Sequence, residues 1–201
     1  MKRLIAALLL AGVAGWHSAA LAQNTAAGTQ INNRATVNYS VGGNPQTPIE
    51  SSPTGNTVPG TGNGANTSFL VDDRVSHTVV ALGSGTVVTP NSVNQVTAFS
   101  LTNTGNAPHA YALGVVNLTG GTVFGNTDTT DVTNLRTFVD ANGNGTYESG
   151  VDTAVNVQSL AAGASVTVFV LADIPMTTSN GQFANVRLTA RAAENNNPAN
   201  P

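Results

Sequence analysis

Alternation between apolar and polar residues constrains the fold of this chain more than any other feature. Apolar residues occupy every second position in residues 165–174, and the same period of two recurs in residues 182–193. Successive side chains of a β-strand point to opposite faces of a sheet, so this period predicts strands with one buried face. A shift of one residue would expose every buried side chain, and the pattern therefore also fixes the register.

Similar runs, separated by clusters of Gly, Asn and Pro, extend this pattern along the chain. Thr and Val favour pleated strands, whereas Asn and Gly favour tight turns. Short strands at this spacing predict an all-β fold, specifically an immunoglobulin-like antiparallel β-sandwich preceded by an N-terminal strand and a long loop. The remaining sandwich strands are expected at residues 69–82, 93–102, 109–118, 135–139 and 151–157.

The first 22 residues have the pattern of a secretory signal peptide. Lys2 and Arg3 precede an apolar core at residues 4–15, and Ala20-Leu21-Ala22 forms a small-x-small cleavage site. The apolar core is too short to span a membrane. We therefore expect cleavage after Ala22, no membrane span afterwards, and a secreted or cell-surface location.

Charge and cysteine content exclude several classes of protein. Once Lys2 and Arg3 are removed, five arginines remain against ten carboxylates, a net charge of −5. This balance disfavours nucleic acid and anionic membranes as partners. The chain contains no cysteine, which excludes disulfides, a lipoprotein anchor and thiolate metal sites.

The segment before the predicted sandwich, residues 23–68, has two parts. Residues 31–41 alternate like a half-buried strand, whereas residues 42–68 are rich in Gly, Pro and Asn and are expected to form a long loop or linker. The strand is either the first strand of the sandwich at residues 69–193 or a strand donated to the sheet of a neighbouring copy. Residues 194–201 are expected to be a disordered tail.

The most specific chemical pattern lies on a turn between two predicted strands, from Asp140 to Asp152. Oxygen-bearing side chains alternate there and Gly145 permits a sharp turn, which is the ligand rhythm of a calcium loop. Two Asn ligands predict weak binding of calcium, with a Kd of about 10⁻⁴–10⁻³ M. The expected ligands are Asp140, Asn142, Asn144, the carbonyl of Thr146, Glu148 and Asp152.

This loop departs from a helix–loop–helix calcium site in two ways. Its twelfth position is Val151, so the next carboxylate, Asp152, comes one residue late. The flanking segments are predicted strands and not helices. An Asn- and Gly-rich hairpin turn without a metal is therefore the alternative interpretation.

Three segments carry a family resemblance. Residues 88–106 end in Asn-Thr-Gly-Asn, residues 138–152 hold the loop just described, and residues 160–168 run Leu-Ala-Ala-Gly-Ala-Ser-Val-Thr-Val. Together they resemble the conserved-repeat domain of unknown function found in bacterial surface proteins. The resemblance implies an immunoglobulin-like fold on a secreted or cell-surface protein, and it implies no catalytic residues.

Residue patterns for catalysis are weak. There is no Gly-x-Ser-x-Gly nucleophile elbow, and the adjacent carboxylates Asp72 and Asp73 would point to opposite faces of a strand. We therefore expect no enzyme and no catalytic residues. The sequence favours a structural or adhesive module that contacts itself or other surface proteins. A carbohydrate- or protein-binding module is the alternative, and a hydrolase is the weakest of the three.

Overall fold

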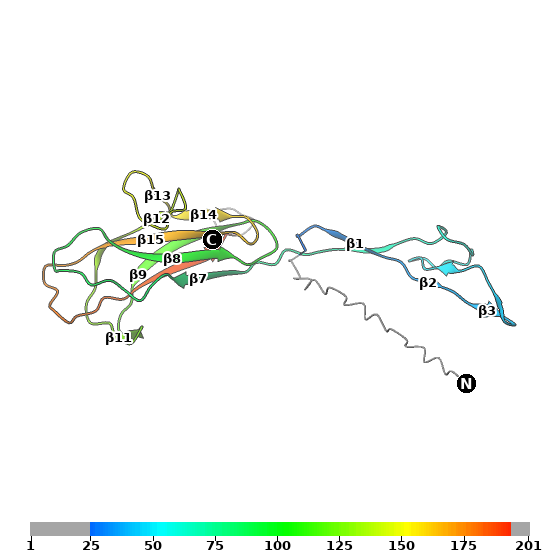
Figure 1. The fold of residues 1–201 in the computed structure, drawn as a ribbon, viewed down its shortest axis with the longest axis horizontal. Helices are drawn as coiled ribbons and strands as arrows, with labels where there is room; N and C mark the ends of the chain where they lie inside the picture. Colours follow the sequence, from blue (N-terminus) through cyan, green and yellow to red (C-terminus); the bar gives the residue numbers. More distant parts are fainter. Residues whose placement is uncertain (1–24, 194–201) are drawn as a thin grey trace, which may run out of the picture.

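The computed structural model describes residues 25–193, so the predicted signal peptide and C-terminal tail lie outside the described residues. Over this range the chain is all-β, as predicted. It has two parts, a sandwich of two sheets and an elongated β-hairpin that projects from one end of it (Figure 1). We call this hairpin, residues 25–71, the arm. The described part of the chain contains no helix with the length and hydrophobicity that a membrane crossing requires.

Two antiparallel sheets form the sandwich, and most of its strands lie within a few residues of the predicted ones. The prediction of one sandwich strand at residues 69–82 is wrong, because residues 67–70 pair within the arm and only residues 77–81 join the sandwich. The sandwich therefore begins after the arm and not at residue 69. The predicted strand at 151–157 is split, because its first part pairs with one sheet and its continuation with the other. The larger sheet has the order β13-β12-β15-β8-β7, with β7 at His77–Ala81, β8 at Gln95–Asn103, β12 at Thr133–Val139, β13 at Thr153–Ala154 and β15 at Ser165–Asp173. The smaller sheet has the order β14-β9-β16, with β9 at His109–Asn117, β14 at Val157–Leu160 and β16 at Val186–Ala192.

The core lies between the facing sides of these two sheets. Its members come from both sheets, which is what one apolar face per strand predicts. Each fully buried Val or Leu contributes about 1.5–3 kcal/mol relative to an exposed one, so this cluster holds the sheets together. The buried cluster consists of Leu101, Tyr111, Leu113, Val139, Leu160, Val168, Val170 and Leu188.

Strand β15 departs from the prediction of one buried face. Val168 and Val170 face the core, but Phe169 and Leu171, which alternate with them, are also only 1% exposed. A central strand covered on both sides has a continuous apolar run, and residues 168–172 fit that description. Part of the outer cover comes from the loop that follows β12, described below.

The arm is one long hairpin closed by a two-residue turn. Gly42 and Gly43 have φ angles of 57° and 83°, the left-handed values that a type I′ hairpin turn requires. Residues 42–68 therefore return along the outgoing strand, and residues 31–41 pair with this return segment and with neither sheet of the sandwich (Figure 1). The paired elements are β1 (Gln30–Asn33) with β6 (Thr67–Leu70), β2 (Thr36–Val37) with β5 (Ile49–Glu50), and β3 (Ser40–Val41) with β4 (Asn44–Pro45).

A buried carboxylate closes a loop in the return segment of the arm. Glu50 is 4% exposed, and its Oε2 accepts hydrogen bonds from the backbone N–H of Gly64 (3.1 Å) and Gly62 (2.8 Å). Arg34 Nη1 lies 3.5 Å from the same oxygen. The Gly64 N–H, with the Gly62 N–H and Arg34, outweighs desolvation and holds the pKa of Glu50 below its usual range.

Buried asparagines at the end of β8 form a corner, residues 103–106. Asn103 is fully buried, and its Nδ2 donates to the carbonyls of Ala107 (2.9 Å) and Leu160 (3.1 Å). Its Oδ1 accepts from the backbone N–H of Gly105 at 2.9 Å. A Cβ at Gly105 would collide with the Arg74 carbonyl, so only glycine fits there. The side chain of Asn103 thus fixes the corner against the sandwich.

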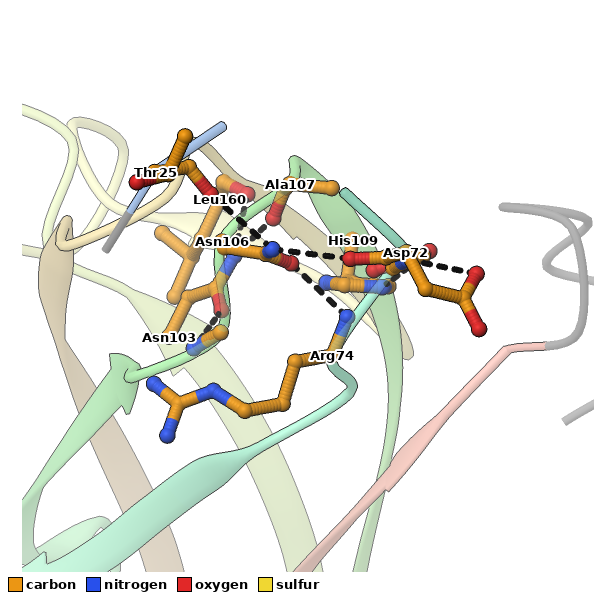
Figure 2. A network of polar contacts seen from close by, with 10 residues as sticks. Thr25, Asp72, Arg74, Asn103, Asn106, Ala107, His109 and Leu160 are labelled. Carbon is orange, nitrogen blue, oxygen red and sulfur yellow. Dashed lines mark hydrogen bonds and ion pairs between the residues drawn. The ribbon is translucent and has the colours of Figure 1, made fainter. Parts of the chain in front are cut away.

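Asn106 in the same corner attaches the arm. Figure 2 shows its amide between the two segments at the base of the arm, the one that enters the arm and the one that leaves it. Its Nδ2 donates to the carbonyls of Thr25 (3.1 Å) and Asp72 (2.9 Å), and its Oδ1 accepts from the N–H of Arg74 at 2.7 Å. The Asn106 carbonyl accepts from Ala27 N–H at 3.2 Å. One residue therefore holds both the entry and the exit of the arm.

Asn103→Ala should destabilise the protein by about 3 kcal/mol, because it leaves two buried carbonyls and one buried N–H without their partner. Urea unfolding measures this change. Asn33→Ala, at an exposed position of β1, should change stability by less than about 0.5 kcal/mol. Equal effects of the two substitutions would contradict the role given to Asn103.

The loop closed by Glu50 should open in acid. The pKa of Glu50 is lower in the folded state than its value of 4.5 in the unfolded chain. The ionised carboxylate therefore stabilises the fold at pH values above 4.5, and this stabilisation is lost as the pH falls through the folded-state pKa. Amide resonances of Gly62 and Gly64 should therefore shift together below pH 4.5. In a Glu50→Gln variant this titration should be absent, and its persistence would show that another group closes the loop.

Candidate functional site

The predicted calcium loop connects β12 to β13, which pair through Phe138↔Ala154 and Val139↔Thr153. Asp140 and Asp152 stand at its two ends, and each is 7% exposed. Every oxygen of these two carboxylates accepts a backbone hydrogen bond from within the loop, so they hold its shape. The donors are Gly143 N (2.7 Å) and Gly145 N (2.8 Å) for Asp140, and Ala141 N (3.1 Å) and Glu148 N (2.6 Å) for Asp152.

Three further predicted ligands meet at one point of the loop. The Nδ2 atoms of Asn142 and Asn144 both donate to Oε2 of Glu148, at 2.6 and 2.8 Å. The Asn142 Oδ1 accepts from Asn144 N–H at 3.1 Å, and the Asn144 Oδ1 accepts from Thr146 N–H at 2.8 Å. The structure thus brings Asn142, Asn144 and Glu148 together. Thr146 joins this network through its N–H and not through its carbonyl, which was the predicted ligand.

An aromatic side chain that sequence reasoning missed anchors the loop. Tyr147 packs edge-on against Phe138 and Phe169, with ring centroids 5.1 and 5.9 Å away. Phe138 and Phe169 are directly paired across β12 and β15, on the outer face of the larger sheet. Tyr147 therefore folds the loop onto this face, and it accounts for the burial of Phe169 on the outer side of β15. The only signal in the sequence is an aromatic residue inside an otherwise polar turn.

The chemistry of this loop fits a hard cation. A carboxylate or amide oxygen has two lone pairs, so an oxygen that accepts one hydrogen bond can still bind a metal. Calcium takes 6–8 oxygen ligands, and the six predicted ligands reach the lower limit. No three His, Cys, Asp or Glu side chains gather into a metal-binding group within residues 25–193. A cation here would therefore need the oxygens of Asn142 and Asn144, whose amides now turn their nitrogen toward Glu148.

The arm provides a second candidate site, an exposed apolar surface. Ile31 lies opposite Phe69 and Val37 opposite Ile49, and side chains directly opposite in an antiparallel pair share a face. Val41 has the same parity along the outgoing strand and adds to this face. The exposed fractions are 59% for Val37, 62% for Val41 and 57% for Phe69, whereas Ile31 and Ile49 are half-buried. We call these five residues the arm face.

Sequence reasoning placed residues 31–41 on an amphipathic strand but missed what makes the strand part of an arm. Glu50 lies in the segment predicted to be a linker, and the sequence gives Asn106 no structural role, although Glu50 closes the loop of the arm and Asn106 attaches the arm. The Gly-Gly pair at the tip was the available signal for a hairpin.

Comparisons with protein-family models, with curated proteins and with solved structures found no match to this chain. The resemblance to the bacterial surface domain and the immunoglobulin-like topology therefore stay predictions.

Tyr147→Ala should lower the free energy of unfolding by about 2 kcal/mol, because it removes a half-buried ring and its contacts with Phe138 and Phe169. Tyr147→Phe keeps both ring contacts and should stay within about 0.5 kcal/mol of the native value. Thermal unfolding of the two variants distinguishes them. If both variants were as stable as the native protein, Tyr147 would not anchor the loop.

Proposed function

We propose that this protein is an exported structural or adhesive module of the cell surface or extracellular matrix. The observation that carries the proposal is the arm, which projects away from the sandwich (Figure 1) and carries the exposed apolar side chains Val37, Val41 and Phe69. Apolar side chains gathered on an exposed surface mark contact sites for other molecules. In this proposal the sandwich is the support and the arm is the contact element.

The attachment at Asn106 supports this role. Contact elements that transmit force or set spacing need a fixed direction, and an amide bonded to both chains of the arm base supplies one. Arg74 adds a second link, because its Nη2 donates to the Thr104 carbonyl at 2.6 Å. The side chain of His109 is 4% exposed, and its Nε2 lies 3.2 Å from Asp73 Oδ2. These bonds join the sandwich to the segment that leaves the arm.

Calcium is the proposed stabiliser of the 140–152 loop. Without the ion, the loop is held by hydrogen bonds from backbone N–H groups and by the two amides on Glu148. With the ion bound, oxygens of Asp140, Asn142, Asn144, Glu148 and Asp152 and the Thr146 carbonyl would hold it. The signal peptide predicted from the sequence and the proposed calcium loop both support a location outside the cytosol, where calcium is plentiful.

Calcium should raise the melting temperature. At about 10 mM calcium and a Kd of about 1 mM, mass action adds about 1.4 kcal/mol. For a chain of this size that corresponds to an increase of about 3–6 °C. Differential scanning calorimetry with calcium and with a chelator measures the shift.

Glu148→Gln removes one ligand charge with little change of shape, and it should reduce the calcium-dependent shift to about 1 °C. Asp128→Asn is the matched control, because Asp128 also accepts backbone N–H groups but lies in another loop. The control should keep the full shift. Identical melting curves of the native protein with calcium and with chelator would refute the calcium site.

A further inference from the structure

The end of the sandwich opposite the arm also carries exposed apolar side chains, set among polar residues. Three loops meet there, at residues 82–94, 119–130 and 174–185 (Figure 1). Backbone hydrogen bonds join them, from Thr129 N–H to the Phe183 carbonyl and from Ile174 N–H to the Ser92 carbonyl, both at 2.8 Å. We call their exposed apolar side chains the distal face: Leu82, Val87, Val93, Phe124, Met176 and Phe183, which are 43–100% exposed.

Phe124 is the most informative residue of the distal face. It occupies, with Gly125, the two-residue turn between β10 (Thr122–Val123) and β11 (Asn126–Thr127). Its φ of 51° is left-handed, a conformation that strains a bulky residue and that favours Asn or Gly. Phe124 is also 61% exposed, so packing within the chain does not offset this strain. A strained, exposed aromatic side chain indicates a contact with another molecule.

Charge does not oppose contact between the arm face and the distal face. The arm carries one cation and one anion, Arg34 and Glu50, and they pair with each other. The three distal loops contain one charged residue, Asp128. Its carboxylate accepts hydrogen bonds from the N–H groups of Gly120 and Asn185. Neither surface therefore carries the like charges or lysines that block association of exposed β-structure.

We infer that the arm face of one copy binds the distal face of the next copy, so that the protein assembles head to tail. This inference rests on the proposed structural role and names its partner as a second copy of this chain. The two surfaces lie at opposite ends of the molecule, so one copy cannot cover its own arm face. A heterologous contact between opposite ends repeats from copy to copy, and it produces a linear filament unless the rotation between copies closes a ring.

The size of the arm face predicts a weak contact. From residue 31 to residue 41 the arm is about 35 Å long, and its two paired strands are about 10 Å wide. The arm face therefore covers about 350 Å² on each partner. The total of about 700 Å² is below the roughly 1,200 Å² of a stable complex, so assembly should depend on concentration. Analytical ultracentrifugation over a concentration series should show a mass that rises steadily beyond the dimer.

Two variants separate the arm face from the rest of the arm. Val37→Lys with Val41→Lys places charges on the arm face, and the purified protein should then stay monomeric. Asn38→Lys with Ser40→Lys is the matched control, because these exposed residues have the opposite parity in the same strand. The control should assemble like the native protein. Equal assembly of the two variants would overturn the inference.

Phe124→Asn with Met176→Lys tests the distal face. Asn suits the left-handed turn position, so the variant should melt at or above the native temperature, yet it should stay monomeric. Assembly of this variant at native strength would show that arms bind each other, and it would overturn the head-to-tail arrangement.

Mixing the arm variant with the distal variant gives the sharpest test. Each has one intact surface, so an equimolar mixture should form dimers and nothing larger. A mixture that stays monomeric would overturn the inference. If the native protein is monomeric at every concentration but calcium still raises its melting temperature, the self-contact is refuted and the calcium-stabilised module stands. If both results are negative, both proposals fail.

Discussion

The amide of Asn106 is the interaction on which the arrangement of this protein depends. It forms hydrogen bonds with Thr25, in the segment that enters the arm, and with Asp72 and Arg74, in the segment that leaves it. Its position is set in turn by Asn103, which is buried in the sandwich and bonded to Leu160. Without this corner, the arm would be a two-stranded ribbon on a flexible joint, and an isolated hairpin is marginally stable in water.

The sandwich could be predicted from the sequence because alternation is a local property of each strand. The pattern at residues 165–174 survives in β15, and only its outer face departs from prediction, because Phe169 is covered by Tyr147 from a distant turn. The arm could not be predicted in the same way. Its return segment is rich in Gly, Pro and Asn, and it is ordered by the partner strand and by Glu50 rather than by its own propensity.

In the candidate loop, too, the features set by neighbouring residues could be predicted, and those set by contacts with distant strands could not. The alternation of Asp140, Asn142 and Asn144 marks the loop in the sequence. In the structure Asn142 and Asn144 both donate to Glu148, whereas Asp140 accepts a hydrogen bond from the Gly145 N–H of the same loop. The anchor, Tyr147, depends on strands far along the chain. The proposed contact surfaces depend on exposure, which the sequence does not contain: Val37 alternates like a core residue but faces solvent.

The central claim is that the sandwich presents the arm in a fixed direction. Residual dipolar couplings of backbone amides in weakly aligned protein test it directly. The account predicts that one alignment tensor fits the amides of the arm strands β1 and β6 together with those of β8 and β15. A separate tensor for the arm, or arm couplings averaged close to zero, would contradict it and would leave the arm as a flexible appendage.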